Sequence, residues 1–431
     1  MEKLKHYIRF GSHAEAKVLK EVKSHIRGLT FNANIVAHRP VAIYRLLFIN
    51  FPAVDYFVDP QTYIFQLDPI KYYSNKKGKI KNSVLQLAKS YGEPFTNCCS
   101  LKPISPDEFL NSNIDSITKS VIEFQLNYIN DEFNKIKTYE GYDDYENDNS
   151  NSSVLNPEFV IPPSFYLNID KASFSKWLNL NESCIKSARV QFPDRIIVPE
   201  LILDKRLLNN NEYLNDIIEK YNNLGLKRIL IWIDDFDETE EDQINLGSLV
   251  SFYKRLDIGK ISLFGGGFSL LLFYKKLLDG FCHGPGYGES RGIKPVGGGR
   301  PTAKYYLPYL MNRLDYTVCE RILQTKNDLN STYFKNVCNC KICKKNLTPP
   351  SQSTFFTTYG LTQLSSTGKS EIPVPTSLFN SHVHFLEHRF YEINEMTFDR
   401  LIKMFEEFIQ WNESHSLIST EHLSSWIKIL K

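Results

Sequence analysis

The chain has 431 residues, 42% of them hydrophobic and 23% charged, values that exclude a disordered or fibrous protein and allow a large buried core. Lysine and arginine exceed aspartate and glutamate by only two, 51 against 49, so the chain as a whole lacks the basic charge of a nucleic-acid binder. No run of about 18 apolar residues is present, and the first residues, MEKLKHYIRF, lack the apolar segment of a signal peptide, so we expect a cytoplasmic protein without a membrane span.

The N-terminal third alternates extended and helical patterns. Residues 33–37 (ANIVA) and 54–65 (VDYFVDPQTYIF) are predicted as strands, and residues 40–50 (PVAIYRLLFIN) have helical periodicity. Residues 76–81 (KKGKIK) form a basic run, which is more often a solvated turn than a nucleic-acid contact. Residues 138–157 are acidic, rich in Asn and Ser and poor in aliphatic side chains, which predicts an exposed insertion.

After this insertion, apolar segments alternate regularly with amphipathic ones. The predicted strands are residues 165–169 (FYLNI), 195–203 (RIIVPELIL), 227–234 (KRILIWID) and 260–264 (KISLF). Strands that are nearly continuous in Ile, Leu and Val indicate a parallel sheet with both faces covered. A closed barrel and an open sheet both fit this pattern, and in either case functional residues gather at the carboxyl ends of the strands.

Four aspartates lie within or just after predicted strands. Asp234, Asp235 and Asp237 belong to WIDDFDE, and Asp59 precedes Pro60 in the predicted strand 54–65. Asp234 and Asp235 are candidates for binding a purine edge or for acid–base chemistry, and Asp237 is a weaker one. The structural alternative is a helix N-cap or first-turn acid for the WIDDFDE residues and a simple turn for Asp59.

Glycine-rich segments follow at residues 264–268 (FGGGF), 280–292 (GFCHGPGYGESRG) and 296–302 (VGGGRPT). The backbone N–H groups of Gly265, Gly266 and Gly267 are candidates for cradling a phosphate or a base, and a tight turn is an equally common use of such glycines. The middle segment offers a thiol, a base, a ring, an acid and a cation in Cys282, His283, Tyr287, Glu289 and Arg291. Arg39 and Arg300 are further candidates for a phosphate clamp, although each is more often a surface arginine.

Three of the eight cysteines form a C-x-C-x-x-C motif: Cys338, Cys340 and Cys343. Close cysteine spacing in a chain without a secretion signal favours a metal site, and three thiolates leave one position of a tetrahedral zinc open. Residues 381–392 (SHVHFLEHRFYE) offer His382, His384 and His388 for that position. We expect His384 to complete a Cys₃His structural zinc site. The alternative is three buried free cysteines beside surface histidines.

This cysteine turn, followed by a helical histidine, resembles the zinc subdomain of the tRNA-guanine transglycosylase superfamily. Residues 384–392 (HFLEHRFYE) are similar to the His-aromatic-Leu-x-x-Arg-x-x-Glu pattern of the branches that insert deazapurines into DNA. The resemblance implies a TIM (β/α)8-type barrel with an inserted or C-terminal zinc-binding subdomain. It also implies base exchange at C1′ of a nucleotide through a carboxylate nucleophile, with Asp59 in contact with the base.

One departure concerns the nucleophile. The family carries its nucleophilic aspartate in a Phe-Asp motif, whereas this chain has Phe281-Cys282-His283, and the nearest acids are Asp279 and Glu289. From the resemblance for Asp59, and from the residues themselves for the other three, we predict Asp59, Asp235, Glu289 and His283 as catalytic residues. The predicted substrate-binding residues are Asp234, Gly265, Gly266, Gly267, Cys282, Tyr287 and Arg291.

We accordingly expect residues 1–325 to form the barrel and residues 326–431 to form the zinc-binding subdomain and C-terminal helices. The expected function is exchange of a purine or deazapurine base in tRNA or DNA, with a structural zinc ion and with a homodimer or a partner protein as the assembly. The alternative is a non-catalytic zinc-containing barrel that binds nucleic acid or a modified nucleotide, for example in a phage-defence or mobile-element system. The missing aspartate favours this alternative.

Overall fold

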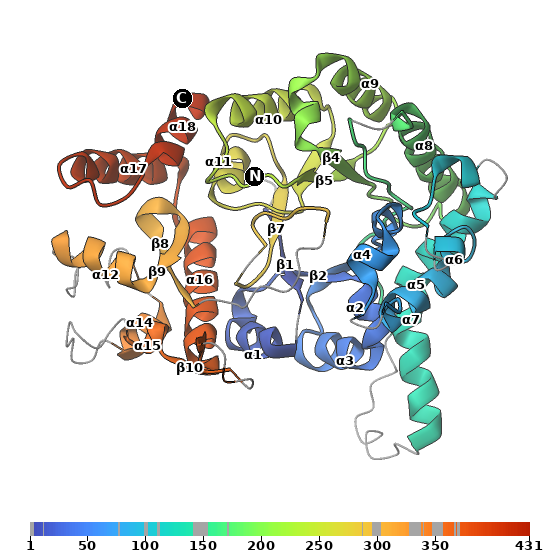
Figure 1. Cartoon of the computed structure of the whole chain (residues 1–431), viewed down its shortest axis with the longest axis horizontal. Helices are drawn as coiled ribbons and strands as arrows, with labels where there is room; N and C mark the ends of the chain where they lie inside the picture. The colour runs from blue at the N-terminus through green and yellow to red at the C-terminus, as the bar shows by residue number, and fades with distance from the viewer. Residues whose placement is uncertain are drawn as a thin grey trace.

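Seven parallel strands form one curled sheet at the centre of the protein (Figure 1). The computed structural model describes residues 4–11, 13–75, 78–98, 102–109, 113–140, 154–169, 172–286, 288–294, 303–326, 338, 340–346, 357–365, 368 and 371–431. The strands are β1 (Lys5–Phe10), β2 (Gly28–Asn32), β3 (Asp55–Asp59), β4 (Glu200–Asp204), β5 (Arg228–Asp234), β6 (Gly259–Ser262) and β7 (Gly280–His283). Their order is β3-β2-β1-β7-β6-β5-β4, so the first strand pairs with the last and the edges are β3 and β4.

Helices surround the strands on their outer side (Figure 1). They include α1 (His13–Glu21), α3 (Pro40–Arg45), α5 (Asn82–Tyr91), α7 (Ile114–Glu140), α8 (Phe174–Gln191), α9 (Asn211–Asn222), α10 (Gln243–Arg255) and α11 (Gly267–Tyr274). Between β4 and β7, strand and helix alternate strictly, which confirms the α/β pattern predicted from the sequence. The central residues of β5, ILIWI (229–233), are all buried because helices cover one face of the sheet and the other face is turned inward.

Two predicted strands of the N-terminal third differ from the structure. Residues 33–37 are helical and belong to α2 (Ala33–His38), so the prediction of a strand there was wrong. The buried side chains of this segment, Ala33, Val36 and Ala37, follow the spacing of one helix face, and the strand is the preceding segment, β2, all of whose residues are buried. The predicted strand 54–65 is β3 followed by the 3-10 helix η3 (Thr62–Gln66).

An extended segment, residues 158–167, lies between the two edge strands. Its start contacts β3, where the Glu158 N–H donates to the Tyr56 carbonyl at 2.7 Å. Its end pairs with β4, where the Leu167 N–H donates to the Ile202 carbonyl and the Asp204 N–H donates to the Leu167 carbonyl, both at 3.0 Å. The predicted strand 165–169 belongs to this segment and pairs through an isolated bridge.

Along much of this segment, side chains rather than a neighbouring strand form hydrogen bonds with the backbone N–H and carbonyl groups. The Gln125 amide binds both the N–H and the carbonyl of Ile161, and the Asn181 amide binds both groups of Phe165. Thr62 does the same for Ser164, and Gln66 for Tyr166. Buried backbone groups need partners, so these four side chains let an irregular segment stay buried between the sheet edges.

The C-terminal part packs beside the sheet. It contains the hairpin β8 (Lys304–Leu307) and β9 (Asn312–Asp315), helices α12 (Tyr316–Thr325), α14 (Lys341–Asn346) and α15 (Thr357–Gly360), the hairpin β10 (Thr362–Leu364) and β11 (Glu371–Pro373), and helices α16 (Pro375–Glu395), α17 (Phe398–Glu413) and α18 (Glu421–Leu430). The hairpin β8–β9 lies before the predicted boundary at residue 326, yet it packs on α16 through a bond from the Lys304 N–H to Ser381 Oγ. The predicted insertion at 138–157 lies largely outside the described residues. None of the described helices has the length and hydropathy that a bilayer-spanning helix needs.

Candidate functional site

Polar side chains line the inner face of the sheet near the carboxyl ends of β1, β2 and β3. Arg9 is opposite Thr30 in the register, and Asn32 is opposite Asp59. Paired residues of neighbouring strands point to the same face, and so do residues two apart on one strand, so all four side chains face inward. The strand register therefore brings a cation, an amide and a carboxylate together where parallel α/β folds place their sites.

Asp59 is the best-connected group of this face. Its Oδ1 accepts from the Gln61 N–H at 2.9 Å, and its Oδ2 accepts from the Tyr63 hydroxyl at 3.2 Å and from Arg9 Nη1 at 3.4 Å. Gln61 has a φ of 54°, in the left-handed region, and this turn after β3 aims its N–H back at the carboxylate. The Asp59 side chain is held in one position by three donors.

Glu200, at the start of β4, is the second carboxylate of the inner face. It is 1% exposed, and burial together with the nearby Asp59 charge raises the pKa of Glu200 well above its usual range, against the opposing effects of Arg9 and Arg291. Both effects favour the protonated form of Glu200. Neither of its carboxyl oxygens has a hydrogen-bond partner among the described residues. We call Arg9, Asp59, Tyr63 and Glu200 the central cluster.

Aromatic rings and a second arginine border the central cluster. The Trp232 ring lies 5.1 Å from the Tyr63 ring and 4.9 Å from the Phe264 ring, measured between centroids. The Arg9 guanidinium lies 4.4 Å above the Phe264 ring, and the Arg291 guanidinium lies 5.8 Å from the Trp232 and Phe264 rings. Planar rings beside fixed polar groups are suited to a flat heterocycle.

The WIDDFDE aspartates have different surroundings. Asp234 accepts from the Tyr166 hydroxyl and from the Ile293 N–H, both at 2.6 Å, and burial raises the pKa of Asp234. Asp235 is exposed and has a φ of 53°, and its N–H donates to the Arg291 carbonyl. Asp237 binds Thr239 and Ser290. All three fix the loops around the mouth of the sheet, and Asp235 alone projects to solvent.

The N–H groups at the glycine-rich turn, residues 265–267, do bind an acidic group, and that group is a side chain of this protein. Glu238 Oε2 accepts from the N–H groups of Gly266, Phe268 and Ser269 at 2.9–3.2 Å, and Ser269 Oγ donates to Glu238 Oε1. Glu238 is 5% exposed, and burial raises its pKa to about 7. The predicted phosphate or base cradle is therefore filled by Glu238 at the amino end of α11.

Cys282 and His283 lie inside β7, the strand with which the glycine-rich segment 280–292 begins. Cys282 is fully buried, and burial raises the pKa of its thiol to about 12, so it carries no thiolate at neutral pH. His283 points to the other face of the sheet, where its Nε2 lies 2.8 Å from His6 Nε2 and its Nδ1 2.8 Å from the Gly284 carbonyl. Burial lowers the pKa of His283 to about 3. The structure thus places His283 away from Cys282 and the central cluster.

Glu289 is held between two arginines of the C-terminal part. Arg313 Nη2 contacts Glu289 Oε2 at 2.8 Å, and Arg389 Nη2 contacts Glu289 Oε1 at 2.7 Å. Arg389 is fully buried and also pairs with Glu392 at 3.1 Å. This network makes Glu289 an anchor of the loop after β7.

Other predicted residues lie elsewhere. Arg39 is exposed between α2 and α3, and Tyr287 and Arg300 lie outside the described residues. Asp279 directly precedes β7, at the amino end of the strand and so at the opposite end of the sheet from the mouth. Asp279 therefore does not face the same opening as Asp59.

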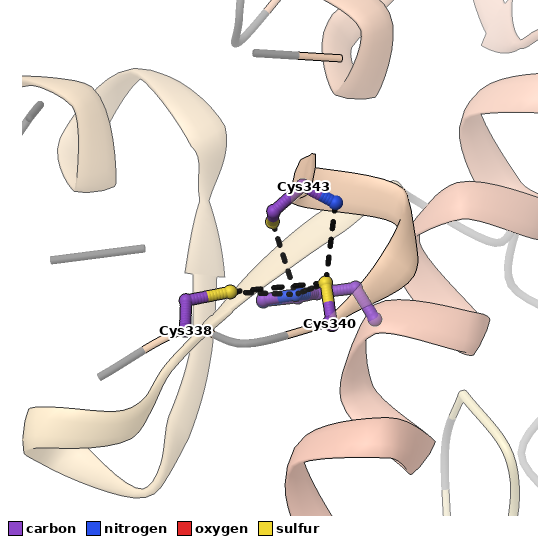
Figure 2. A group of neighbouring side chains, drawn as sticks. Cys338, Cys340 and Cys343 are labelled. Carbon is purple, nitrogen blue, oxygen red and sulfur yellow. Dashed lines mark hydrogen bonds between the residues drawn. The ribbon is translucent and has the colours of Figure 1, made fainter. Parts of the chain in front are cut away.

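Cys338, Cys340, Cys343 and His384 form a buried cluster that could hold a metal ion. Figure 2 shows the three cysteines pointing toward one another, with Cys343 on the short helix α14. The Cys338 and Cys340 sulfurs are 3.7 Å apart, and His384 Nδ1 lies 3.7, 3.2 and 3.5 Å from the sulfurs of Cys338, Cys340 and Cys343. Bond lengths of about 2.3 Å to sulfur and about 2.0 Å to nitrogen give tetrahedral edges of about 3.8 Å and 3.5 Å.

The other nitrogen of His384 is fixed by the hairpin β8–β9. His384 Nε2 lies 2.8 Å from the Tyr306 carbonyl, so it carries the hydrogen and leaves Nδ1 free to bind a metal. Of the three candidate histidines, His384 is the one in the cluster. His388 packs beside the His384 ring at 4.9 Å, and His382 is half-buried with a pKa that desolvation lowers to about 4.

Sequence reasoning missed Arg9, Glu200 and Glu238, and it included Arg389 only as part of the His-aromatic-Leu-x-x-Arg-x-x-Glu pattern. A charged residue within an apolar strand is a usable signal, and it is present in YIRF around Arg9 and in VPELIL around Glu200. Glu238 carries no such signal because it lies in a charged segment. No known family model matches the chain, and no curated protein is significantly similar to it in sequence. The functional argument therefore comes from the geometry of the site.

Proposed function

We propose that this protein is a transglycosylase-like enzyme that exchanges a purine base at C1′ of a nucleotide in tRNA or DNA. The observation that carries the proposal is the pair of buried carboxyl groups, Asp59 and Glu200, on one inner face beside aromatic rings. Base exchange needs a carboxylate to attack C1′ and a proton for the departing base. Asp59, held by three donors, suits the first role, and protonated Glu200 suits the second.

In the proposed reaction an Asp59 oxygen forms a bond to C1′ while the glycosidic C–N bond breaks, and the electron pair leaves with the base. Glu200 gives its proton to that base. The incoming base then attacks C1′, its N–H proton returns to Glu200, and Asp59 is released. Placing the nucleophile on β3 departs from the resemblance, which assigns it to the position of Cys282. The neutral, buried thiol there supports the reassignment.

We further propose that the seven-stranded sheet and segment 158–167 together make a closed barrel of the TIM type. Backbone bonds to β3 at one end of the segment and to β4 at the other support closure. Closure excludes water from the inner face, which strengthens every electrostatic contact of the central cluster.

We assign the metal of the Cys₃His cluster as zinc. The donor set and the spacings of 3.2–3.7 Å between ligand atoms fit tetrahedral zinc, and four protein ligands leave no position for substrate. The ion would therefore stabilise the fold. When bound, it would hold α14 against α16 through Cys343 and His384.

A nucleic-acid substrate is supported by a groove beside this cluster. The groove has a volume of about 780 Å³ and is lined by His25, Arg27, Lys341 and Lys344 together with residues of α16. Lys341 pairs with Glu21 and Glu387, whereas Arg27 and His25 are exposed at the end of the first helical region. Cations along a groove of this size suit contacts to a phosphate backbone.

A second candidate function, binding of a base or modified nucleotide without exchange, is favoured by one observation. The position that the resemblance assigns to the nucleophile holds a thiol that is neutral at physiological pH. A protein with this cluster and no exchange activity would bind a base without replacing it.

The test is incorporation of radiolabelled guanine into tRNA and into duplex DNA by the purified protein. We expect incorporation by the wild type, loss of at least 100-fold in Asp59→Asn, and no change in the control Asp194→Asn, whose side chain is exposed on the loop before β4. A covalent nucleic-acid adduct on denaturing gels is expected for the wild type and not for Asp59→Asn. No incorporation into either nucleic acid by the wild type would remove the exchange proposal and leave the binding function.

A further inference from the structure

His388 is a buried imidazole beside the metal cluster, and it has no hydrogen-bond partner among the described residues. Neither its Nδ1 nor its Nε2 is bonded, although the residue is only 2% exposed. Buried polar side chains in folded proteins almost always have a partner. This ring is therefore expected to bind a ligand or an ordered water.

The position of His388 on α16 brings it next to the cluster without making it a member. It follows His384 by four residues, about one helical turn, so the two rings lie on the same face of α16, with their centroids 4.9 Å apart. The ligand atoms of the cluster all lie within 4.8 Å of one another, and His388 is not in that group. An ion in the cluster has four ligands without His388, so this ring is suited to binding the ion on its way in or out.

The groove beside the cluster connects His388 to solvent. This groove, of about 780 Å³, is lined by His388 and by Cys340, which is 5% exposed. The other three ligands, Cys338, Cys343 and His384, are fully buried and do not line it. Ligand exchange that starts from solvent therefore meets His388 and Cys340 first.

The charges along the groove nearly balance. The cations that line it are Arg27, Lys341 and Lys344, and the acids are Glu387 and Glu395. A divalent cation therefore gains little electrostatic attraction from these groups, and a neutral donor is needed to draw it inward. An imidazole is such a donor and a common ligand of zinc.

We propose that this groove is the entry path of the metal and that His388 is the entry ligand, which binds the ion transiently as it moves to or from the Cys₃His cluster. The proposal rests on the assignment of zinc to the cluster. During loading, a ring nitrogen of His388 donates its lone pair to the ion, and Cys340 and then the three buried ligands replace it. The thiols release their protons to solvent, and His388 gains and loses none. Release follows the same steps in reverse, so the ion keeps a protein ligand throughout.

Release of zinc from the purified, zinc-loaded protein tests the path. An excess of the chelator pyridylazoresorcinol captures the ion, and its absorbance gives the rate. We expect the rate to rise in proportion to the chelator concentration, because the chelator reaches the ion through the groove of the folded protein. A rate that does not depend on the chelator concentration would mean that the protein must open before release. That result would overturn the entry path without any variant.

Two variants test the role of His388. His388→Phe keeps a ring of similar size and removes both nitrogens, and His388→Asn removes the imidazole without narrowing the groove. We expect both variants to hold one zinc ion per chain and to release it about tenfold more slowly than wild type at the same chelator concentration. A role in packing alone predicts the opposite, because a loosened cluster would release the ion faster. Tyr391→Phe, at another position that lines the groove, is the matched control and should release zinc at the wild-type rate.

Urea unfolding shows whether each variant is folded, and a single folded variant is sufficient for the comparison. Release that is unchanged or faster in a folded His388 variant would overturn the role of His388 and leave the zinc assignment standing. A wild type that takes up no zinc would remove the assignment and this inference together. Incorporation of guanine is a separate measurement, so base exchange stands or fails independently of these rates.

Discussion

Replacing Glu238 by glutamine is expected to stabilise the protein above pH 7, although Glu238 accepts four hydrogen bonds. Three come from the backbone N–H groups of Gly266, Phe268 and Ser269, and one from the Ser269 hydroxyl. Glutamine can keep the three N–H bonds with its oxygen and donate to Ser269 Oγ with its nitrogen. It thus reproduces the protonated form of Glu238 without a charge.

The magnitude follows from the pKa. Burial raises the pKa of Glu238 from 4.5 to about 7, so the folded state binds this proton more tightly than the unfolded state does. The stabilisation from this proton is complete below pH 4.5, falls as the pH rises and is lost above pH 7. At 1.36 kcal/mol for each pH unit, the loss is at most about 3 kcal/mol. Glutamine is insensitive to pH and should avoid that loss.

Urea unfolding of wild type and Glu238→Gln at pH 5, 6.5 and 8 measures this difference. We expect similar free energies of unfolding at pH 5 and an advantage of about 2–3 kcal/mol for the variant at pH 8. Glu240→Gln, at an exposed position two residues away, should differ little from wild type at every pH. A variant that is less stable than wild type at pH 8, or a difference that does not change with pH, would show that Glu238 is stabilising as an anion.

Two further predictions concern the cysteines. The purified protein should contain one zinc ion per chain by elemental analysis. Cys340→Ser should lose the ion and unfold at a lower urea concentration than wild type. A wild type that contains no metal and is no more stable to urea than Cys340→Ser would contradict the assignment. Cys282 should resist alkylation by iodoacetamide in the folded protein because its thiol is buried and neutral. Cys282→Ala should keep at least half of the guanine incorporation. Rapid alkylation, or loss of incorporation in the folded variant, would show that the thiol is reactive.

The parts of the fold that the sequence predicts well are those with a strong local signal. KRILIWID has a continuous apolar centre, ILIWI, and contains β5, and the residues of the C-x-C-x-x-C motif lie together with His384 in a group that could hold a metal ion. Residues 33–37 lack such a signal because a segment as short as ANIVA suits a strand as well as a short helix. The short strand β7 also lacks a clear strand pattern in the sequence because it begins with Gly280 and is followed by Gly284.

The central cluster could not be predicted because it depends on the register of distant strands. Arg9, Asp59 and Glu200 come from β1, β3 and β4, and their meeting requires the curl that brings the two sheet edges toward segment 158–167. The glycine turn illustrates a related limit. Its composition predicts free N–H groups that bind an anion, yet the identity of that anion depends on the tertiary position of Glu238.

The metal cluster and the central cluster are separate in the sequence, and α16 connects them. His384 of this helix faces the three cysteines, and Arg389, little more than one turn later, contacts Glu289 at 2.7 Å. Two residues after Glu289, the Arg291 carbonyl accepts from Trp232 Nε1 at 2.9 Å and from the Asp235 N–H at 3.0 Å. A metal ion that fixes the orientation of α16 would therefore also fix the loop after β7. This loop places the Arg291 guanidinium beside the Trp232 and Phe264 rings. Through this connection, an ion bound by these four residues would influence the mouth of the sheet even though it has no open position for substrate.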